Sequence, residues 1–187
     1  IVTFSQYDTI FGRPTIRISN GIDFAHIPLK TNVNDTSNTV HLLGVADIHF
    51  WHGFDRVVAG LADYYRRPHE KEVIFHIVGG GSRFTVPELR EQVREQGMEE
   101  RVVLHGPLWG EALDRAFEEA DLGIASLGRH RNGITHIKTL KNREYAARGI
   151  PFVYSENDSD FDAMPYVLKA PADESPIDID ALLHFLD

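Results

Sequence analysis

The stretch that decides the fold is NGITHIKTLKNREYAARGIPFVY, residues 132–154. Residues 135–148 have a helix-forming, amphipathic composition, which predicts a helix. Gly149 suits the left-handed conformation that ends a helix, and Pro151 prevents its continuation. The apolar residues 150–154 then predict a short buried strand, with the proline near its start, where a missing N–H is tolerated. The stretch therefore predicts a helix followed directly by a strand.

A second buried strand is predicted just upstream, at residues 121–126 (DLGIAS). Strand, loop, helix and strand together form a βαβ crossover, whose loop 127–135 lies at the carboxyl end of a strand, where ligands bind in open α/β sheets. Its segment GRHRNG, residues 128–133, is basic and leads into the predicted helix N-terminus, an arrangement that favours anions such as phosphate. On that helix Glu144 would share a face with His136, about two turns earlier. A surface helix with scattered charges explains this stretch equally well on its own.

Strands and helices alternate along most of the chain. Further strands are expected at 39–45, 72–78, 101–105 and, weakly, 166–168, with helices at 54–66, 86–96, 111–120 and 179–186. This order predicts an α/β fold, a Rossmann-like, doubly wound and mostly parallel sheet with helices on both faces.

The N-terminal part has a different pattern. Residues 1–4 and 14–19 predict short strands, and the Asn- and Thr-rich residues 28–38 predict a linker. We therefore expect residues 1–38 to be a hinge or linker segment and the main domain to span 39–187. The first residue is Ile rather than Met, from which we expect a fragment of a larger protein.

Composition excludes several classes of function. The 187 residues carry a formal net charge of −9, which argues against nucleic acid as a partner, although a basic loop can still meet a phosphorylated ligand. The absence of cysteine excludes disulfides, thiolate metal sites and cysteine nucleophiles. No apolar run approaches the ~18 residues of a membrane span. The ten histidines show no HExxH-like spacing, so we expect no metal.

Three loops, 46–53, 79–84 and 128–135, follow strands and should meet at one sheet edge. The triple glycine at 79–81 lets backbone approach a ligand closely, or forms only a tight turn. It matches neither the dinucleotide fingerprint nor the Walker motif. His52 precedes a glycine at a helix start, where an imidazole is able to meet phosphate or transfer a proton.

Three other histidines, His41, His76 and His105, lie within apolar strands, which predicts satisfied core or edge side chains rather than ligands. Trp51 is suited to stack on a ligand or to cap the core. No nucleophile elbow is present.

Several motifs occur in a consistent order between residues 39 and 155. They are WHGFDR (51–56), FHIVGGG (75–81), VVLHG (102–106), ADLGI (120–124), LKNREY (140–145) and GIPF (149–152). Together they resemble the C-terminal, nucleotide-sugar-binding half of GT-B glycosyltransferases, specifically the retaining family 4 group in its bacterial capsular and exopolysaccharide branch. NGID (20–23) resembles that family's hinge between the two halves.

The resemblance implies a donor-binding set, made of His52, Gly53, Gly80, Gly81, Leu108, Gly133, Ile134, Lys141 and Glu144. Glu144 would accept hydrogen bonds from the ribose hydroxyls, Lys141 and the loop amides of residues 132–135 would neutralise the diphosphate, and the backbone at Leu108 would meet the nucleobase. The family commonly has lysine where His52 stands and a sugar-contacting glutamate where His136 stands. The resemblance assigns no catalytic residue.

The implied activity is transfer of a hexose-type sugar from a UDP- or GDP-sugar to a glycan or lipid-linked acceptor in polysaccharide biosynthesis, with no cofactor or metal. The acceptor-binding half is not in this sequence, so we expect donor binding without efficient transfer. A non-catalytic nucleotide-binding domain of GT-B-like fold is the alternative, with His136 as its sign, and a nucleotide-sugar epimerase is a third candidate. The expected location is the cytoplasm, with the inner face of the cell membrane, reached by peripheral association of the full-length protein, as an alternative.

Overall fold

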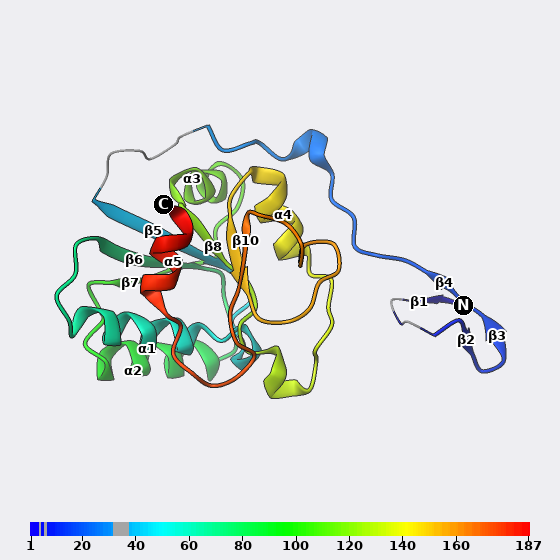
Figure 1. Cartoon of the computed structure of the whole chain (residues 1–187), viewed down its shortest axis with the longest axis horizontal. Coiled ribbons are helices and arrows are strands. Elements are labelled where there is room, and N and C mark those ends of the chain that lie inside the picture. Colours follow the sequence, from blue (N-terminus) through cyan, green and yellow to red (C-terminus); the bar gives the residue numbers. More distant parts are fainter. Residues whose placement is uncertain (4, 6, 32–37) are drawn as a thin grey trace.

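A six-stranded sheet forms the centre of the molecule, in a computed structural model that describes residues 1–3, 5, 7–31 and 38–187 (Figure 1). All neighbouring strands in it are parallel, in the order β10-β9-β8-β5-β6-β7. Their bounds are β5 Thr39–Val45, β6 Glu72–Val78, β7 Val102–Gly106, β8 Leu122–Ile124, β9 Phe152–Tyr154 and β10 Val167–Lys169. The chain winds outward from β5 in one direction and then from β8 in the other. The carboxyl ends of β5 and β8 therefore flank the topological switch point of a doubly wound sheet.

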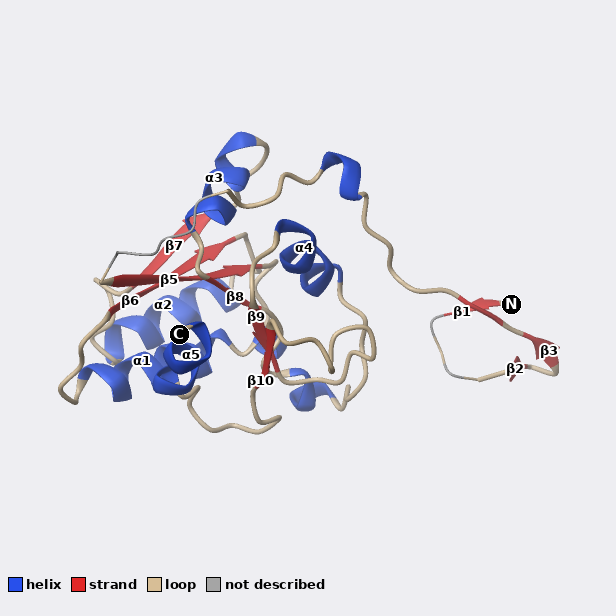
Figure 2. Ribbon diagram, turned by 45° about the horizontal axis from the view of Figure 1, so that its top comes forward, coloured by secondary structure: helices blue, strands red, loops and turns tan. Residues whose placement is uncertain are grey.

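Helices cover both faces of this sheet (Figure 2). One face carries α1 Phe54–Tyr65, α2 Thr85–Glu95 and α5 Ile179–Leu186, and the other carries α3 Glu111–Glu119 and α4 Leu140–Arg148. Three short 3₁₀ helices are η1 Phe24–His26, η2 Phe50–His52 and η3 Arg129–Asn132. The predicted fold class is confirmed, and most helix and strand bounds agree with the predictions within one or two residues.

Two apolar clusters hold the helices to the sheet because side chains alternate along the strands. Leu42 of β5 packs toward α1, whereas its neighbour Leu43 belongs to the cluster with α3 and α4. Tyr145 of α4 is fully buried, with its hydroxyl 2.8 Å from the Leu43 carbonyl and 3.2 Å from the Ile124 carbonyl. A side chain at Gly123 would lie 2.7 Å from the Tyr145 ring, so only glycine fits. Tyr145 thereby fixes α4 over the switch point.

The helix predicted at residues 135–148 begins later, at Leu140, so the prediction was wrong for its first five residues. Thr139 has an extended backbone and caps the helix, its hydroxyl accepting from the Asn142 amide at 3.3 Å. Before it, the chain runs alongside residue 157, with the Asn157 amide donating to the Thr135 carbonyl at 2.7 Å. His136 therefore lies outside α4 and does not share a helix face with Glu144.

The N-terminal residues form two small sheets that stand apart from the main body (Figure 1). β1 Val2–Thr3 pairs with β4 Ile16–Arg17 in parallel, and β2 Thr9–Ile10 pairs with β3 Arg13–Pro14 in antiparallel. The strand predicted at 14–19 is thus divided between two partners. Phe4 of the first predicted strand and residues 32–37 of the predicted linker lie outside the described residues.

The segment that follows these small sheets contacts α4 and α3. The Arg143 Nε donates to the Asn20 carbonyl at 2.7 Å, and the Lys30 amide donates to the Arg148 carbonyl at 2.8 Å. The Thr31 amide donates to a Glu118 carboxylate oxygen at 3.0 Å. Part of the predicted linker therefore lies against the main domain.

Candidate functional site

The loops that follow β5 and β8 are joined at the switch point. The Leu127 amide donates to the His52 carbonyl at 2.9 Å, and the Gly128 amide donates to the Trp51 carbonyl at 3.2 Å. Between them Gly53 has φ of +67°, and a Cβ there would lie 2.7 Å from the Leu127 backbone. Gly53 is therefore required for the close approach of the two loops.

A buried cluster of four polar side chains, His52, Arg129, Lys141 and Glu156, lies behind these loops; we call it the switch-point cluster. Nζ of Lys141, Nε of Arg129 and both carboxylate oxygens of Glu156 are buried, and none has a hydrogen-bond partner among the described residues. Only 3% of Glu156 and 7% of His52 are exposed. Because buried polar groups are normally paired, this concentration of unpaired ones marks a place where a polar ligand or water fits.

Burial controls the charge of this cluster. Desolvation lowers the pKa of Lys141 to about 7, although Glu156 opposes the shift and Arg129 adds to it. Desolvation likewise raises the pKa of Glu156 to about 7, against the influence of its own backbone, Arg129 and Lys141. Lys141 and Glu156 thus change charge near neutral pH.

His52 is held neutral in the folded protein. Desolvation first, then Lys141, Arg129 and His49, lower its pKa to about 2. Its Nδ1 accepts a hydrogen bond from the His49 amide at 3.1 Å, which leaves Nε2–H as its donor. A neutral His52 is suited to meet phosphate as a hydrogen-bond donor, and positive charge at this site comes from Lys141 and Arg129.

The basic loop at 128–133 is less available to anions than its sequence suggests. Arg131 forms ion pairs with Asp55 at 2.6 Å and with Glu174 at 2.5 Å, and His130 lies 2.7 Å from Glu174. These partners raise the pKa of Arg131 above its usual range and lower that of Glu174 to about 2. Of the loop's cations, only Arg129 joins the switch-point cluster.

Two of the amides predicted to neutralise a diphosphate, those of Gly133 and Ile134, donate to the protein's own backbone. The Gly133 amide donates to the His130 carbonyl at 3.0 Å, and the Ile134 amide donates to the Arg129 carbonyl at 3.1 Å. Both residues close the turn of η3, and an extended segment separates them from α4. Neither amide lies at the N-terminus of α4.

The glycine loop lies beside the switch point, since the Ile48 amide donates to the Gly80 carbonyl at 2.7 Å. Gly79 has φ of +133°, and a Cβ there would lie 1.8 Å from the Ala46 carbonyl oxygen. A Cβ on Gly81 would lie 2.8 Å from Thr85 Oγ1 at the start of α2. Packing explains Gly79 and Gly81, whereas a Cβ on Gly80 would make only ordinary contacts, with Pro107 at 3.6 Å and Asp47 at 4.0 Å.

Leu108 and Glu144 lie toward α3 rather than in the switch-point cluster. Leu108 packs against the apolar cluster beneath α3 and α4. One carboxylate oxygen of Glu144 accepts from Arg148 at 3.1 and 3.2 Å, and Arg148 also pairs with Asp114 at 2.8 Å. In the described part of the chain the other oxygen, Oε2, accepts no hydrogen bond. Glu144 is thus oriented by Arg148 with one oxygen left for a ligand.

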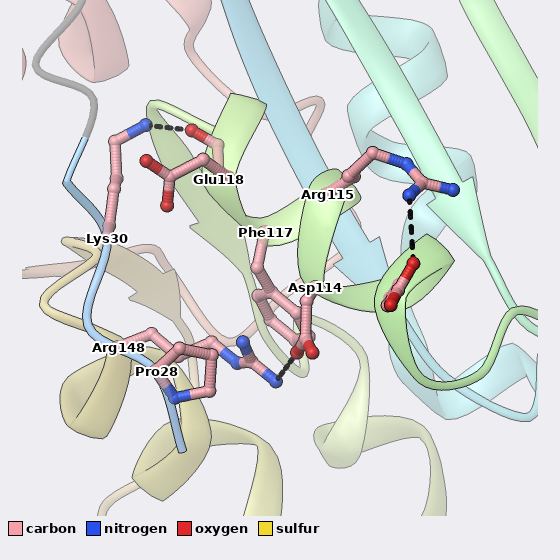
Figure 3. A pocket seen from close by; sticks show the side chains of 8 residues that line it. Pro28, Lys30, Asp114, Arg115, Phe117, Glu118 and Arg148 are labelled. Carbon is pink, nitrogen blue, oxygen red and sulfur yellow. Dashed lines mark hydrogen bonds and ion pairs between the residues drawn. The ribbon is translucent and has the colours of Figure 1, made fainter.

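A cavity of about 340 Å³ lies on the other side of this ion pair (Figure 3). It is lined by Pro28, Lys30, Glu111, Asp114, Arg115, Phe117, Glu118 and Arg148. Arg148 pairs there with Asp114 at 2.8 Å and Arg115 with Glu111 at 3.8 Å, while Lys30 donates to the Glu118 carbonyl (Figure 3). None of the predicted site residues lines this cavity.

Histidines account for no metal site in the described residues, where no group of three or more His, Asp or Glu side chains is arranged to hold a metal. His41 Nδ1 lies 3.0 Å from His76 Nε2, and His76 Nδ1 lies 2.9 Å from His105 Nε2, in a row across β5, β6 and β7. The prediction of satisfied edge histidines is therefore confirmed. No helix within the described ranges is both long and apolar enough to cross a bilayer.

Sequence reasoning did not single out Glu156, which lies in the acidic segment SENDSD, residues 155–160. Glu156 and Asp158 are 3% and 1% exposed. One signal was present: Glu156 follows the strand at 150–154, so it lies at the same carboxyl edge as the other three loops.

Comparisons with known proteins agree on the fold. No protein-family model and no curated protein sequence matches the chain. Among solved structures, Anabaena HepE in complex with UDP and glucose is 18% identical with a TM-score of 0.65, over 90% of this chain and 47% of that one. A glycosyltransferase from Rickettsia africae has a TM-score of 0.69 at 12% identity, over 95% and 49%.

The C-terminal domain of a group 1 family glycosyl transferase, LpcC from Francisella tularensis, has a TM-score of 0.54 at 13% identity, over 87% of this chain and 79% of that domain. The chain thus spans about half the length of the full-length glycosyltransferases it matches. Its parallel sheet flanked by helices is the Rossmann-like fold of one half of a GT-B glycosyltransferase.

Proposed function

We propose that this chain is the nucleotide-sugar-binding half of a glycosyltransferase and that its donor diphosphate binds at the switch-point cluster. The observation that carries the proposal is that Nζ of Lys141 and Nε of Arg129, near the carboxyl ends of β5 and β8, are buried without a hydrogen-bond acceptor among the described residues and face the aromatic rings of Phe54 and Trp51, respectively. Diphosphate is a suitable ligand because it offers several anionic acceptors to two converging donors. The solved structures of HepE, to which this chain is similar, contain UDP and glucose, UDP alone, or UDP-glucose.

In this proposal the nucleoside extends from the diphosphate toward α3. The unpaired oxygen of Glu144 would accept from the ribose hydroxyls, and the backbone at Leu108 would meet the base. His52 would donate to phosphate from Nε2, beside Gly53, and the missing side chain at Gly80 would let the ligand approach the backbone there. Gly133 and Ile134 would shape the loop that carries Arg129 rather than donate to the diphosphate.

The finer parts of the proposal rest on the sequence motifs. They favour a retaining, family 4-type hexosyltransferase of the capsular and exopolysaccharide branch, with UDP- or GDP-sugar as donor and no cofactor. Residues 1–38 would be the hinge and linker from the other half, and 39–187 the donor domain. The whole protein would bind a glycan or lipid-linked acceptor through that half and act in the cytoplasm or at the inner face of the membrane.

Calorimetric titration of the chain with UDP, GDP and ADP tests donor binding. One nucleotide should bind, and Glu144→Ala should weaken it about 10–100-fold, the loss expected for a charged hydrogen bond. The control variant is Glu91→Ala, whose side chain lies on the exposed face of α2 and pairs with Arg94. Asp121 is not suited as a control, because its carboxylate accepts from the His41 amide and so supports β5. Equal binding by Glu144→Ala and the parent would remove Glu144 from the site, and failure of all three nucleotides to bind would overturn the proposal.

A non-catalytic nucleotide-binding domain is the second candidate, and His136 favours it. This residue is exposed on the segment beside Asn157 and provides no carboxylate for a donor sugar. An assay of donor hydrolysis and transfer with the full-length protein distinguishes the two candidates. A transferase hydrolyses or transfers the donor sugar, whereas a binding domain does neither.

A further inference from the structure

Glu156 is a buried carboxylate that the proposed diphosphate site leaves unused. Both of its oxygens are buried and accept no hydrogen bond from the described residues, and the whole residue is 3% exposed. Lys169 Nζ donates to the backbone carbonyl of Glu156 and not to its carboxylate. A buried carboxylate without partners is costly, which makes it a candidate for a group that gains its partner from a ligand.

The position of Glu156 is fixed on both sides. On one side the Ser155 amide donates to the Ser126 carbonyl at 3.0 Å, at the end of β8. On the other, the Asn157 amide donates to the Thr135 carbonyl at 2.7 Å and the Ile137 amide donates to the Asn157 carbonyl at 3.1 Å. Backbone held in this way on two flanks gives a side chain the fixed geometry that a specific ligand contact requires.

The surroundings of Glu156 are donors that do not reach it. Arg129 and Lys141 both act on its pKa, so they lie nearby, yet Nε of Arg129 and Nζ of Lys141 donate to no protein acceptor. The cluster therefore holds two donors and one carboxylate acceptor that no described protein atom satisfies. A hydroxyl group fits such a cluster, because it donates to a carboxylate and accepts from a cation at the same time.

We propose that Glu156 accepts a hydrogen bond from a hydroxyl of the donor's sugar, next to the diphosphate held by Lys141 and Arg129. This inference rests on the proposed donor-binding function. Phosphate is an unfavourable partner for the ionised form of Glu156, which is present above pH ~7, because two anions repel each other. The ribose is assigned to Glu144, which lies in a separate ion-pair network with Arg148 and Asp114. A polyol attached to the diphosphate is the remaining part of the ligand that carries hydroxyls.

Calorimetric titration of Glu156→Gln with UDP and with a UDP-hexose tests this assignment, using whichever of UDP-glucose, UDP-galactose and UDP-N-acetylglucosamine the parent binds most tightly. The amide keeps the shape but loses the charged acceptor. We expect the affinity for the UDP-hexose to fall about tenfold or more. The affinity for UDP should stay the same or rise, because a negative charge beside the cations is removed. Glu91→Gln is the matched control, since Glu91 lies on the exposed face of α2 and pairs with Arg94.

Parallel losses of affinity for UDP and the UDP-hexose would overturn the inference and assign Glu156 to the nucleotide. Unchanged affinity for both ligands would also overturn it. If the parent itself binds no nucleotide, the proposed function fails and this inference fails with it. If the parent binds UDP but Glu156→Gln behaves as the parent does, only the inference fails.

A second measurement does not depend on the folding of a variant. The parent is titrated with UDP-hexoses that each lack one hydroxyl, and we expect one of them to bind about tenfold more weakly than the complete donor. Equal binding by every deoxy donor would overturn the proposal. Where Glu156→Gln folds, it should bind that deoxy donor and the complete donor equally.

Discussion

Lys141 is a lysine whose charge depends on what occupies the site. Its pKa is lowered to about 7 in the folded chain by burial, and a diphosphate beside it would raise that pKa again. Above pH ~7 nucleotide binding should therefore take up a proton, and affinity should fall as pH rises. Glu156 loses its proton over the same range and adds a negative charge, which acts in the same direction.

We predict that the affinity for UDP falls between pH ~7 and ~9, by up to about tenfold per pH unit for each proton taken up on binding. Calorimetry in two buffers of different ionisation enthalpy would detect the proton uptake directly. Lys141→Met should bind weakly and lose most of the pH dependence. Lys138→Met is the matched control because Lys138 pairs with Asp160 at 2.5 Å. An affinity of the parent that stays constant over this range would show that Lys141 does not face the phosphate.

At the scale of single residues, sequence indicated which side chains gather but not which of them are charged. His52 and Lys141 were predicted for the site, and the structure brings both into one cluster with Arg129 and Glu156. The neutral state of His52 follows from burial, which no spacing rule reports. Arg131 illustrates the converse, since its partners Asp55 and Glu174 lie far from it in sequence.

At the scale of elements, the three glycines after β6 serve different purposes. Gly79→Ala should destabilise the fold by roughly 1–3 kcal/mol or more, because it combines positive φ with a clash against the Ala46 carbonyl. Gly80→Ala meets no atom closer than 3.6 Å and should change stability by less than about 0.5 kcal/mol. Its methyl group would instead enter the space in which we expect the donor, and weaken UDP binding.

Urea unfolding and UDP titration of the two glycine variants separate these effects. A Gly80→Ala variant that binds UDP as the parent does would remove the glycine loop from the site. A Gly79→Ala variant as stable as the parent would contradict the packing explanation.

Element boundaries were predictable where apolar periodicity and turn residues agree, as at Gly149 and Pro151 after α4. The start of the same helix was not predictable from composition. Residues 135–139 favour a helix almost as well as an extended chain, and the choice is made by pairing with Asn157, twenty or so positions later. The backbone of residues 135–137 then holds Glu156 in place, so the failed helix prediction and the missed carboxylate have one cause.

At the scale of the whole molecule, the segment before β5 contacts the donor domain at several points. Asn20 and Ser19 accept from Arg143, and Lys30 and Thr31 contact Arg148 and Glu118. Arg148 in turn orients Glu144. In the proposed function this segment is the hinge, and it would then be one ion pair away from the ribose contact, which gives a physical route from hinge geometry to the proposed donor site.

Two truncated chains test how far this segment belongs to the fold. A chain that begins at Ser19 keeps the contacts to Arg143 and Arg148, and its Tm should equal that of the parent because the small N-terminal sheets stand apart (Figure 1). A chain that begins at Asn38 loses those contacts, at a cost of roughly 1–3 kcal/mol, or about 3–10 °C in Tm for a domain of this size. Calorimetric unfolding of both chains measures the difference. If the shorter chain melts at the temperature of the parent, the domain is complete from residue 39 and the contacts of residues 19–31 contribute nothing to its stability.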